Sequence, residues 1–172
     1  METATPNNQG KPKEQGEAFS QEAQDFFALL VRVLRGYRFQ RGLLNDRLQI
    51  SVEPKDVEDI CRLLKEDPRT SFKMLLCTAA VDYKDYIQMV YMLLSTEHEI
   101  TLAVKTDLSY QDLTVSSLSG IWRAAEWYER EAHDLFGVDF KGHPDLSPLL
   151  LYEGFEGFPG RKEFPFHEYN EY

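Results

Sequence analysis

The segment EREAHDLFGVDFKGHPDL, residues 129–146, holds the densest group of side chains that could do chemistry. Glu129 and His133 are four residues apart, which places them on one face of a predicted helix, and His143 follows ten residues later. A carboxylate and two imidazoles could bind a divalent metal or transfer a proton. The spacing lacks the two histidines of an H-E-x-x-H motif, so its specificity is low. An independent metal-dependent enzyme that uses these three residues is therefore a remote alternative.

The charges of this segment also have a structural interpretation. Glu129, Arg130, Glu131 and Asp134 could form a solvated helix face, as most charge runs do. Large apolar residues surround them, however, and a charge buried without a partner is costly. We expect Arg130 to neutralise Glu131 or Asp134 across one helical turn, and Gly137 to end the helix in the left-handed conformation.

His143 is followed directly by Pro144, and no paired base accompanies the imidazole. A histidine without such a base is a poor proton carrier. We therefore expect His143 to be a structural hydrogen-bonding residue.

Charge and cysteine content limit the classes of function. The formal net charge of -10 argues against nucleic acid as a partner, because that affinity comes mainly from Lys and Arg, and it favours a protein surface. Cys61 and Cys77 lie in apolar runs, and we expect both to be buried. Two cysteines are too few for an iron-sulfur cluster, which generally needs about four thiolates. No run approaches the roughly 20 apolar residues that cross a bilayer, so any membrane attachment would be indirect.

Hydrophobic periodicity divides the chain into three regions. We expect a disordered leader at 1–19, an α+β core domain at 20–140 and an extended tail rich in Gly, Pro and aromatic residues at 141–172. The leader has neither the apolar core of a signal peptide nor an arginine, which favours prokaryotic cytoplasm.

Within the core, the pattern predicts a helix, two strands, a helix, three antiparallel strands and a helix. The two early strands should turn at Asn45–Asp46, and the last helix should be capped by Ser116 or Ser119. This order is typical of a two-layer α+β domain with helices packed on one face of a mixed, mostly antiparallel sheet. The predicted elements occupy residues 20–36, 38–52, 54–67, 72–108 and 116–137.

The tail combines prolines and glycines with seven aromatic residues, including Phe155, so it is neither a helix nor a solvated linker. We expect it to lie extended over a neighbouring subunit, with folding back onto its own sheet as the alternative. Arg161 and Lys162 are the only cations after Lys141, and we expect them to pair with carboxylates of a partner or with Glu129 and Glu131.

Residues 127–165 resemble the signature region of a known family, the 30 kDa subunit of NADH:quinone oxidoreductase, respiratory complex I. The family's pattern, E-R-E-x-x-D-L-F-G-V-x-F-x-G-H-P-D-L, is matched from Glu129 to Leu146. The chain departs from the family's usual residues at Ser147–Pro148, Phe158, Gly160 and Glu163. The residues expected to have structural or interface roles are Glu129, Arg130, Glu131, Asp134, Phe136, Gly137, His143, Pro144, Phe155, Arg161 and Lys162.

The resemblance implies a core scaffold subunit of the peripheral arm, with no catalytic, cofactor-binding or metal-binding residue of its own. FMN, Fe-S clusters and quinone would be carried by partner subunits. The implied partners are the large 49 kDa quinone-site subunit and a small cluster-bearing subunit, at the cytoplasmic face of a prokaryotic inner membrane. Electron transfer from NADH to quinone and proton translocation would belong to the whole complex. The equivalent subunit of a ferredoxin-linked complex or a membrane-bound hydrogenase is the alternative.

Overall fold

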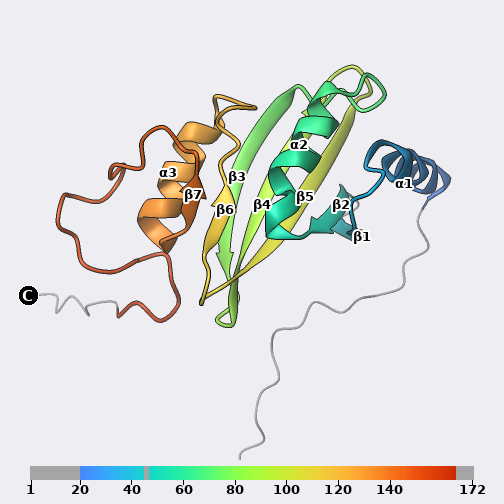
Figure 1. The fold of residues 1–172 in the computed structure, drawn as a ribbon. Coiled ribbons are helices and arrows are strands. Elements are labelled where there is room, and N and C mark those ends of the chain that lie inside the picture. Colours follow the sequence, from blue (N-terminus) through green and yellow to red (C-terminus); the bar gives the residue numbers. More distant parts are fainter. Residues whose placement is uncertain (1–19, 45–46, 166–172) are drawn as a thin grey trace, which may run out of the picture.

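The structure, a computed structural model, describes residues 20–44 and 47–165. Three helices, a five-stranded sheet and a two-stranded sheet make up the described chain (Figure 1). The predicted leader and the Asn45–Asp46 turn lie outside the described residues. The elements in chain order are α1 (Gln21–Val33), β1 (Phe39–Leu44), β2 (Arg47–Val52), the 3-10 turn η1 (Pro54–Asp56), α2 (Val57–Glu66), β3 (Met74–Asp82), β4 (Tyr86–Ser95), β5 (Ile100–Ser109), β6 (Thr114–Ser116), α3 (Ala125–Phe136) and β7 (Asp139–Lys141).

The large sheet has the strand order β1-β2-β5-β4-β3. Strand β2 runs parallel to β5, with Ile50 beside Val104, and every other neighbouring pair is antiparallel. The sheet is therefore mixed and mostly antiparallel, and the predicted α+β fold is confirmed. Strands β1 and β3 form the two edges of the sheet.

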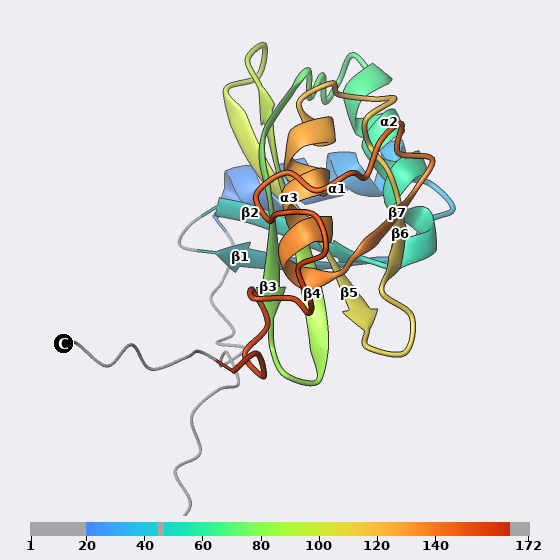
Figure 2. The same ribbon diagram turned by 90° about the vertical axis from the view of Figure 1, so that its left-hand side faces the viewer.

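The core forms where the amphipathic helices meet one face of this sheet. Alternate side chains of β4, including Met89 and Tyr91, are fully buried, as are Ile60 and Leu64 on the apolar stripe of α2. Figure 1 shows α2 in front of β4 and β5, and Figure 2 shows α3 in front of β3. Helix α3 is fastened to that edge strand by the Tyr128 hydroxyl, which donates to the Leu76 carbonyl at 2.9 Å.

The start of the third helix was predicted wrongly. Neither Ser116 nor Ser119 is its cap, because α3 begins only at Ala125, and residues 114–116 form β6. Strand β6 pairs in parallel with β7, which places Val115 beside Phe140 in the core. Two three-residue strands joined through a helix depend on tertiary contacts that local propensity does not encode.

The prediction for the cysteines was half wrong. Cys61 is fully buried on α2, and burial raises the pKa of its thiol. Cys77 is exposed on β3. It pairs with Met92 of β4 on the sheet face that α2 does not cover, so an apolar sequence context alone did not determine its burial.

Candidate functional site: the α3–tail junction

The charged residues of the 129–146 segment gather where α3 meets the chain that follows it. We call this region the α3–tail junction and define it by Glu129, Asp134, Gly137, His143 and Arg161. Each of these residues contacts backbone or side chains of a segment distant from its own turn of the chain. The junction therefore joins α3 to the segment before it and to the tail after it.

Glu129 occupies the inner end of the junction and is fully buried. One carboxylate oxygen accepts the Leu118 N–H at 2.7 Å, and the other accepts the Ser117 hydroxyl at 2.5 Å. Ser117 Oγ also lies 2.8 Å from the hydroxyl of Ser119. The carboxyl group therefore ties α3 to the loop that replaces the predicted start of the helix.

The same burial sets the protonation of Glu129. Desolvation, the largest influence, raises its pKa to about 7, although the hydrogen bonds from Ser117 and Leu118 act in the opposite direction. When the carboxyl is protonated, it can donate to Ser117 Oγ, which then donates to Ser119. The local hydrogen-bond chain thus accommodates either protonation state.

His143 lies beside this carboxyl, with its Nε2 3.9 Å from the Glu129 oxygen and its side chain 1% exposed. Its Nδ1 accepts the Asp145 N–H at 3.1 Å, and its Nε2 is 3.1 Å from the carbonyl of Glu126. These partners assign the tautomer that carries a proton on Nε2. His143 therefore holds the segment after β7 against α3 through hydrogen bonds to backbone groups.

Asp134 binds the tail through a single carboxylate oxygen. Its Oδ2 accepts the backbone N–H groups of Leu149, Leu150 and Leu151 at 3.2, 2.7 and 2.9 Å. Desolvation alone would raise the pKa of Asp134, but these three hydrogen bonds together outweigh it and hold the pKa below its ordinary value. The ionised carboxylate therefore orders a tail segment that has no regular secondary structure.

Arg130 does not neutralise Glu131 or Asp134, contrary to expectation. Its guanidinium donates to the carbonyls of Ser147 and Pro148 at 3.1 and 3.0 Å. The helix directs this side chain toward the tail, and a planar guanidinium with several donors suits two adjacent carbonyls. Arg130 thus holds the tail just before the three N–H groups that Asp134 binds.

The end of α3 is shaped for a close approach of the tail. Gly137 has a φ of 73°, and a Cβ atom there would lie 2.6 Å from the Phe158 ring and 2.7 Å from Arg161 Nη2. The Gly160 N–H donates to the Leu135 carbonyl at 2.9 Å. Only glycine combines the left-handed conformation with that proximity at low cost, so the predicted αL end of the helix is also a docking position.

Arg161 reaches the carboxyl end of α3, where the helix dipole favours a cation. Its Nε donates to the Phe136 carbonyl at 2.8 Å, and its guanidinium stacks 4.3 Å from the centre of the Phe158 ring. The predicted pairing of Arg161 with Glu129 or Glu131 is wrong within this chain. The carboxylate near it is Glu163, at 3.8 Å.

Lys162 is held by its backbone. Its N–H donates to Asp82 Oδ2 at 2.7 Å, at the end of β3, and its ammonium group lies 6.0 Å from the Tyr83 ring centre. Asp82 is buried and also accepts the Lys84 N–H at 2.6 Å. The tail therefore touches the sheet as well as α3. Sequence reasoning missed Asp82, because nothing in a strand of apolar residues signals a bond to a segment 80 residues away.

The remaining predicted site residues lie at the margin of the junction. Glu131 and Pro144 are exposed, while Phe136 and Phe155 are half-buried. Phe155 stacks on Phe164, with ring centres 5.9 Å apart. Ser117 also belongs to the site but was not predicted, because a serine twelve residues before Glu129 gives no spacing signal.

The three residues of the metal-enzyme alternative are engaged otherwise. The ring Nδ1 of His133 is bonded to the Val138 carbonyl at 2.8 Å, and both ring nitrogens of His143 have backbone partners. Within residues 20–44 and 47–165, no group of three or more His, Cys, Asp or Glu side chains could hold a metal ion. In the same residues, no helix is long and apolar enough to cross a membrane.

The fold and the junction are those of an α+β protein in which charged side chains fasten the tail to α3. Residues 50–170 match the model of the family described as respiratory-chain NADH dehydrogenase, 30 Kd subunit. The chain belongs to this family.

Curated relatives agree with this membership. The chain is 39% identical over 124 residues to the NADH-quinone oxidoreductase C 2 subunit of Rhizobium meliloti, covering 70% of this chain and 68% of that protein. It is 36% identical over 163 residues to the mitochondrial NADH dehydrogenase [ubiquinone] iron-sulfur protein 3 of Candida albicans, covering 93% of this chain and 58% of that protein. The alignments thus leave about a third or more of these two relatives unmatched.

Solved structures show the same fold. A chain in the structure of the membrane-bound sulfane sulfur reductase, an archaeal respiratory membrane complex, is similar with a TM-score of 0.72 and 27% identity, covering 84% of this chain and 86% of that one. A trypsin-resistant fragment of Nqo5 has a TM-score of 0.57 and 23% identity, covering 72% of this chain and 99% of that one.

Proposed function

We propose that this chain is a scaffold subunit in the peripheral arm of a proton-translocating NADH:quinone oxidoreductase. The observation that carries the proposal is the family match over residues 50–170, which includes the whole α3–tail junction. The subunit would hold the large quinone-site subunit and a cluster-bearing subunit in fixed positions for electron transfer from NADH to quinone.

The junction supports a structural role for this chain. Asp134 and Arg130 bind backbone N–H and carbonyl groups of the tail, and Arg161 binds the last carbonyl of α3. Groups whose hydrogen bonds are occupied in this way order a surface and are poorly placed to bind a substrate. The catalytic groups of the complex would therefore belong to other subunits.

The proposed partners would carry the cofactors. The chain has two cysteines, Cys61 inside α2 and Cys77 on β3, and an iron-sulfur cluster generally needs about four thiolates. We therefore assign FMN, the clusters and the quinone to neighbouring subunits. The chain would reach the cytoplasmic face of a prokaryotic membrane through those neighbours.

A second candidate is the equivalent subunit of a membrane complex with another electron donor. The observation that favours it is the similarity to a chain of the archaeal sulfane sulfur reductase complex, at a TM-score of 0.72. In that case the scaffold role would be the same, and the electron-input module would differ.

Affinity purification of the tagged full chain from its native membranes tests both candidates. The proposal expects a quinone-site subunit, a cluster-bearing subunit and a flavin-containing NADH module to co-purify, with NADH-dependent quinone reduction. The same subunits without the NADH module would support the second candidate. Recovery of the chain alone would contradict both.

A further inference from the structure

A second surface lies at the other edge of the sheet from β3. Strand β1 pairs with β2 on one side, and no described strand pairs with it on the other. In an antiparallel pair, every second residue of an edge strand directs its N–H and C=O away from the partner strand. Such an edge can accept an extended segment of another protein as an added strand.

Arg35, Arg38 and Arg41 line a hollow beside this edge, although the chain as a whole is acidic. Arg32, Arg35, Arg38 and Arg41 recur at every third position, and no Asp or Glu occurs between residues 31 and 44, in a chain of net charge -10. All four are exposed, and none forms an ion pair with a described carboxylate. The positive charge at β1 is therefore available to an anionic partner.

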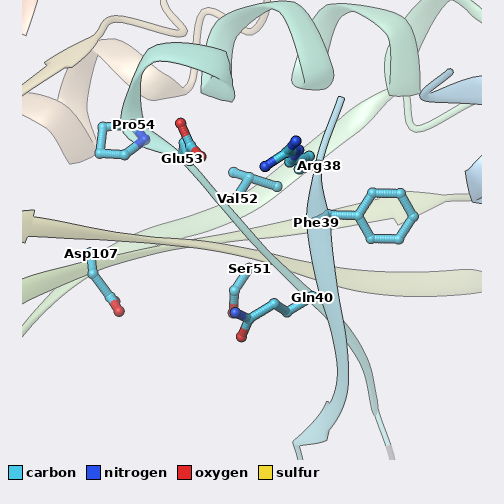
Figure 3. Close-up of a pocket in the computed structure, with 8 residues that line it drawn as sticks. All are labelled: Arg38, Phe39, Gln40, Ser51, Val52, Glu53, Pro54 and Asp107. Carbon is cyan, nitrogen blue, oxygen red and sulfur yellow. The ribbon is translucent and has the colours of Figure 1, made fainter. Parts of the chain in front are cut away.

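Two hollows lie beside β1, and Arg38 and Phe39 line both of them. One, of about 650 Å³, lies against the end of α1 and is also lined by Arg35 and Arg41. The other, of about 490 Å³, includes Gln40, whose side chain lies beside Ser51 while Phe39 points away (Figure 3). Alternating side chains of an added strand would point to opposite faces of the sheet and so toward both hollows.

We propose that the free edge of β1 binds an extended acidic segment of a partner protein. Backbone hydrogen bonds to β1 supply part of the affinity, and carboxylates on the α1 side of the segment meet Arg35 and Arg38. On the opposite face the segment carries small or uncharged side chains, because Glu53 and Asp107 line that hollow and would repel further carboxylates.

The charge of residues 1–19 of this chain complements the arginines less well than an acidic segment would. Residues 1–19 contain three Glu and two Lys, which leaves little net charge to match four arginines. The inference rests on the proposed function only in assuming that the chain works inside an assembly. Its test uses a purified chain and a peptide, so the two proposals can fail separately.

The test is the binding of a fluorescent peptide of about ten residues, alternating Glu with Ser and Val, to the purified full chain at about 150 mM salt. The proposal predicts saturable binding. The double variant Arg35→Glu, Arg38→Glu should weaken that binding roughly tenfold or more. The exposed Arg123→Glu is the matched control. The same peptide with N-methyl groups on alternate residues keeps its charge but cannot extend the ladder, and it should not bind.

Several outcomes would overturn the proposal. Equal binding of the N-methylated peptide would reduce the effect to charge alone. Unchanged affinity in the double variant would show that Arg35 and Arg38 do not contribute to peptide binding. Binding that appears only after deletion of residues 1–19 would assign the edge to the chain's own leader.

Discussion

The Asp134 carboxylate accepts the Leu150 N–H at 2.7 Å, and the neighbouring N–H groups on both sides share the same oxygen. One helix side chain thereby orders three consecutive residues of a tail that forms no helix or strand there. This relationship makes the order of residues 149–151 depend on a single ionised group.

Replacing Asp134 with Ala should therefore loosen the tail without disturbing the sheet. Hydrogen bonds to a charged group contribute about 1.5–3 kcal/mol, and the variant leaves three N–H groups without that acceptor. Amide hydrogen exchange at Leu149, Leu150 and Leu151 should accelerate, while exchange in β4 stays slow. Asp134→Asn, which keeps one acceptor oxygen, should show a smaller effect. Equal protection in all three proteins would contradict the assigned role.

Glu129 should make stability fall as pH rises. Its folded pKa is about 7 and an unfolded glutamate titrates near 4.3, so the folded protein binds more protons between these values. Stability linked to this group is complete below about pH 4 and is lost as the pH rises through 7. Glu129→Gln mimics the protonated form and should gain on the order of 2–3 kcal/mol relative to wild type between pH 4.5 and 8.

Urea unfolding of the two proteins across this pH range measures the difference. The exposed Glu131→Gln on the same helix is the matched control for the chemical change. A free-energy difference between wild type and Glu129→Gln that does not vary with pH would show that burial of the carboxyl has no such effect.

Gly137 and Gly142 separate backbone strain from crowding. Both have positive φ angles, 73° and 82°, but an added Cβ meets Phe158 at 2.6 Å only at Gly137, with nothing within 4 Å at Gly142. Each change to Ala should cost about 1–2 kcal/mol in strain. Gly137→Ala should cost about 1–3 kcal/mol more because the Phe158 ring must move. Equal unfolding free energies for the two variants would contradict the close approach of the tail.

Arg161 and Lys162 are adjacent cations with different attachments. Arg161 uses its guanidinium on the Phe136 carbonyl and the Phe158 ring, whereas Lys162 is bonded through its backbone to Asp82. Arg161→Gln should release the end of the tail at a cost of about 1–3 kcal/mol. Lys162→Gln should have little effect. Rates of chymotrypsin cleavage within residues 150–165 compare them, and equal rates would remove Arg161 from the junction.

Local pattern was enough to predict α1, α2 and the strands of the large sheet, but not the start of α3 or the order of the strands. Periodicity located α1 and α2, and the alternation of β4 located the central strand. Local pattern could not predict the partners of the buried carboxylates. Ser117 contacts Glu129, and the Lys162 N–H contacts Asp82, only after the chain has folded. The short β6–β7 pair was not predicted for the same reason.

Four positions at which the resemblance indicates a departure from the family's pattern make contacts in the structure. Ser147 and Pro148 accept the Arg130 hydrogen bonds, Phe158 stacks on Arg161, and a Cβ at Gly160 would lie 2.8 Å from the Phe136 ring. Ser147 and Pro148 meet the middle of α3 through Arg130, whereas Phe158 and Gly160 lie at its carboxyl end. These contacts became visible only in the fold.

Turnover per assembled complex tests the scaffold proposal most directly. Native complexes that carry Asp134→Ala, His143→Ala or Arg161→Gln in this subunit would be quantified by native gel and assayed for NADH-dependent quinone reduction. The proposal predicts less assembled complex, with an unchanged rate for each complex that does assemble. Full assembly with lost turnover in any of these variants would contradict it and give the junction a catalytic role.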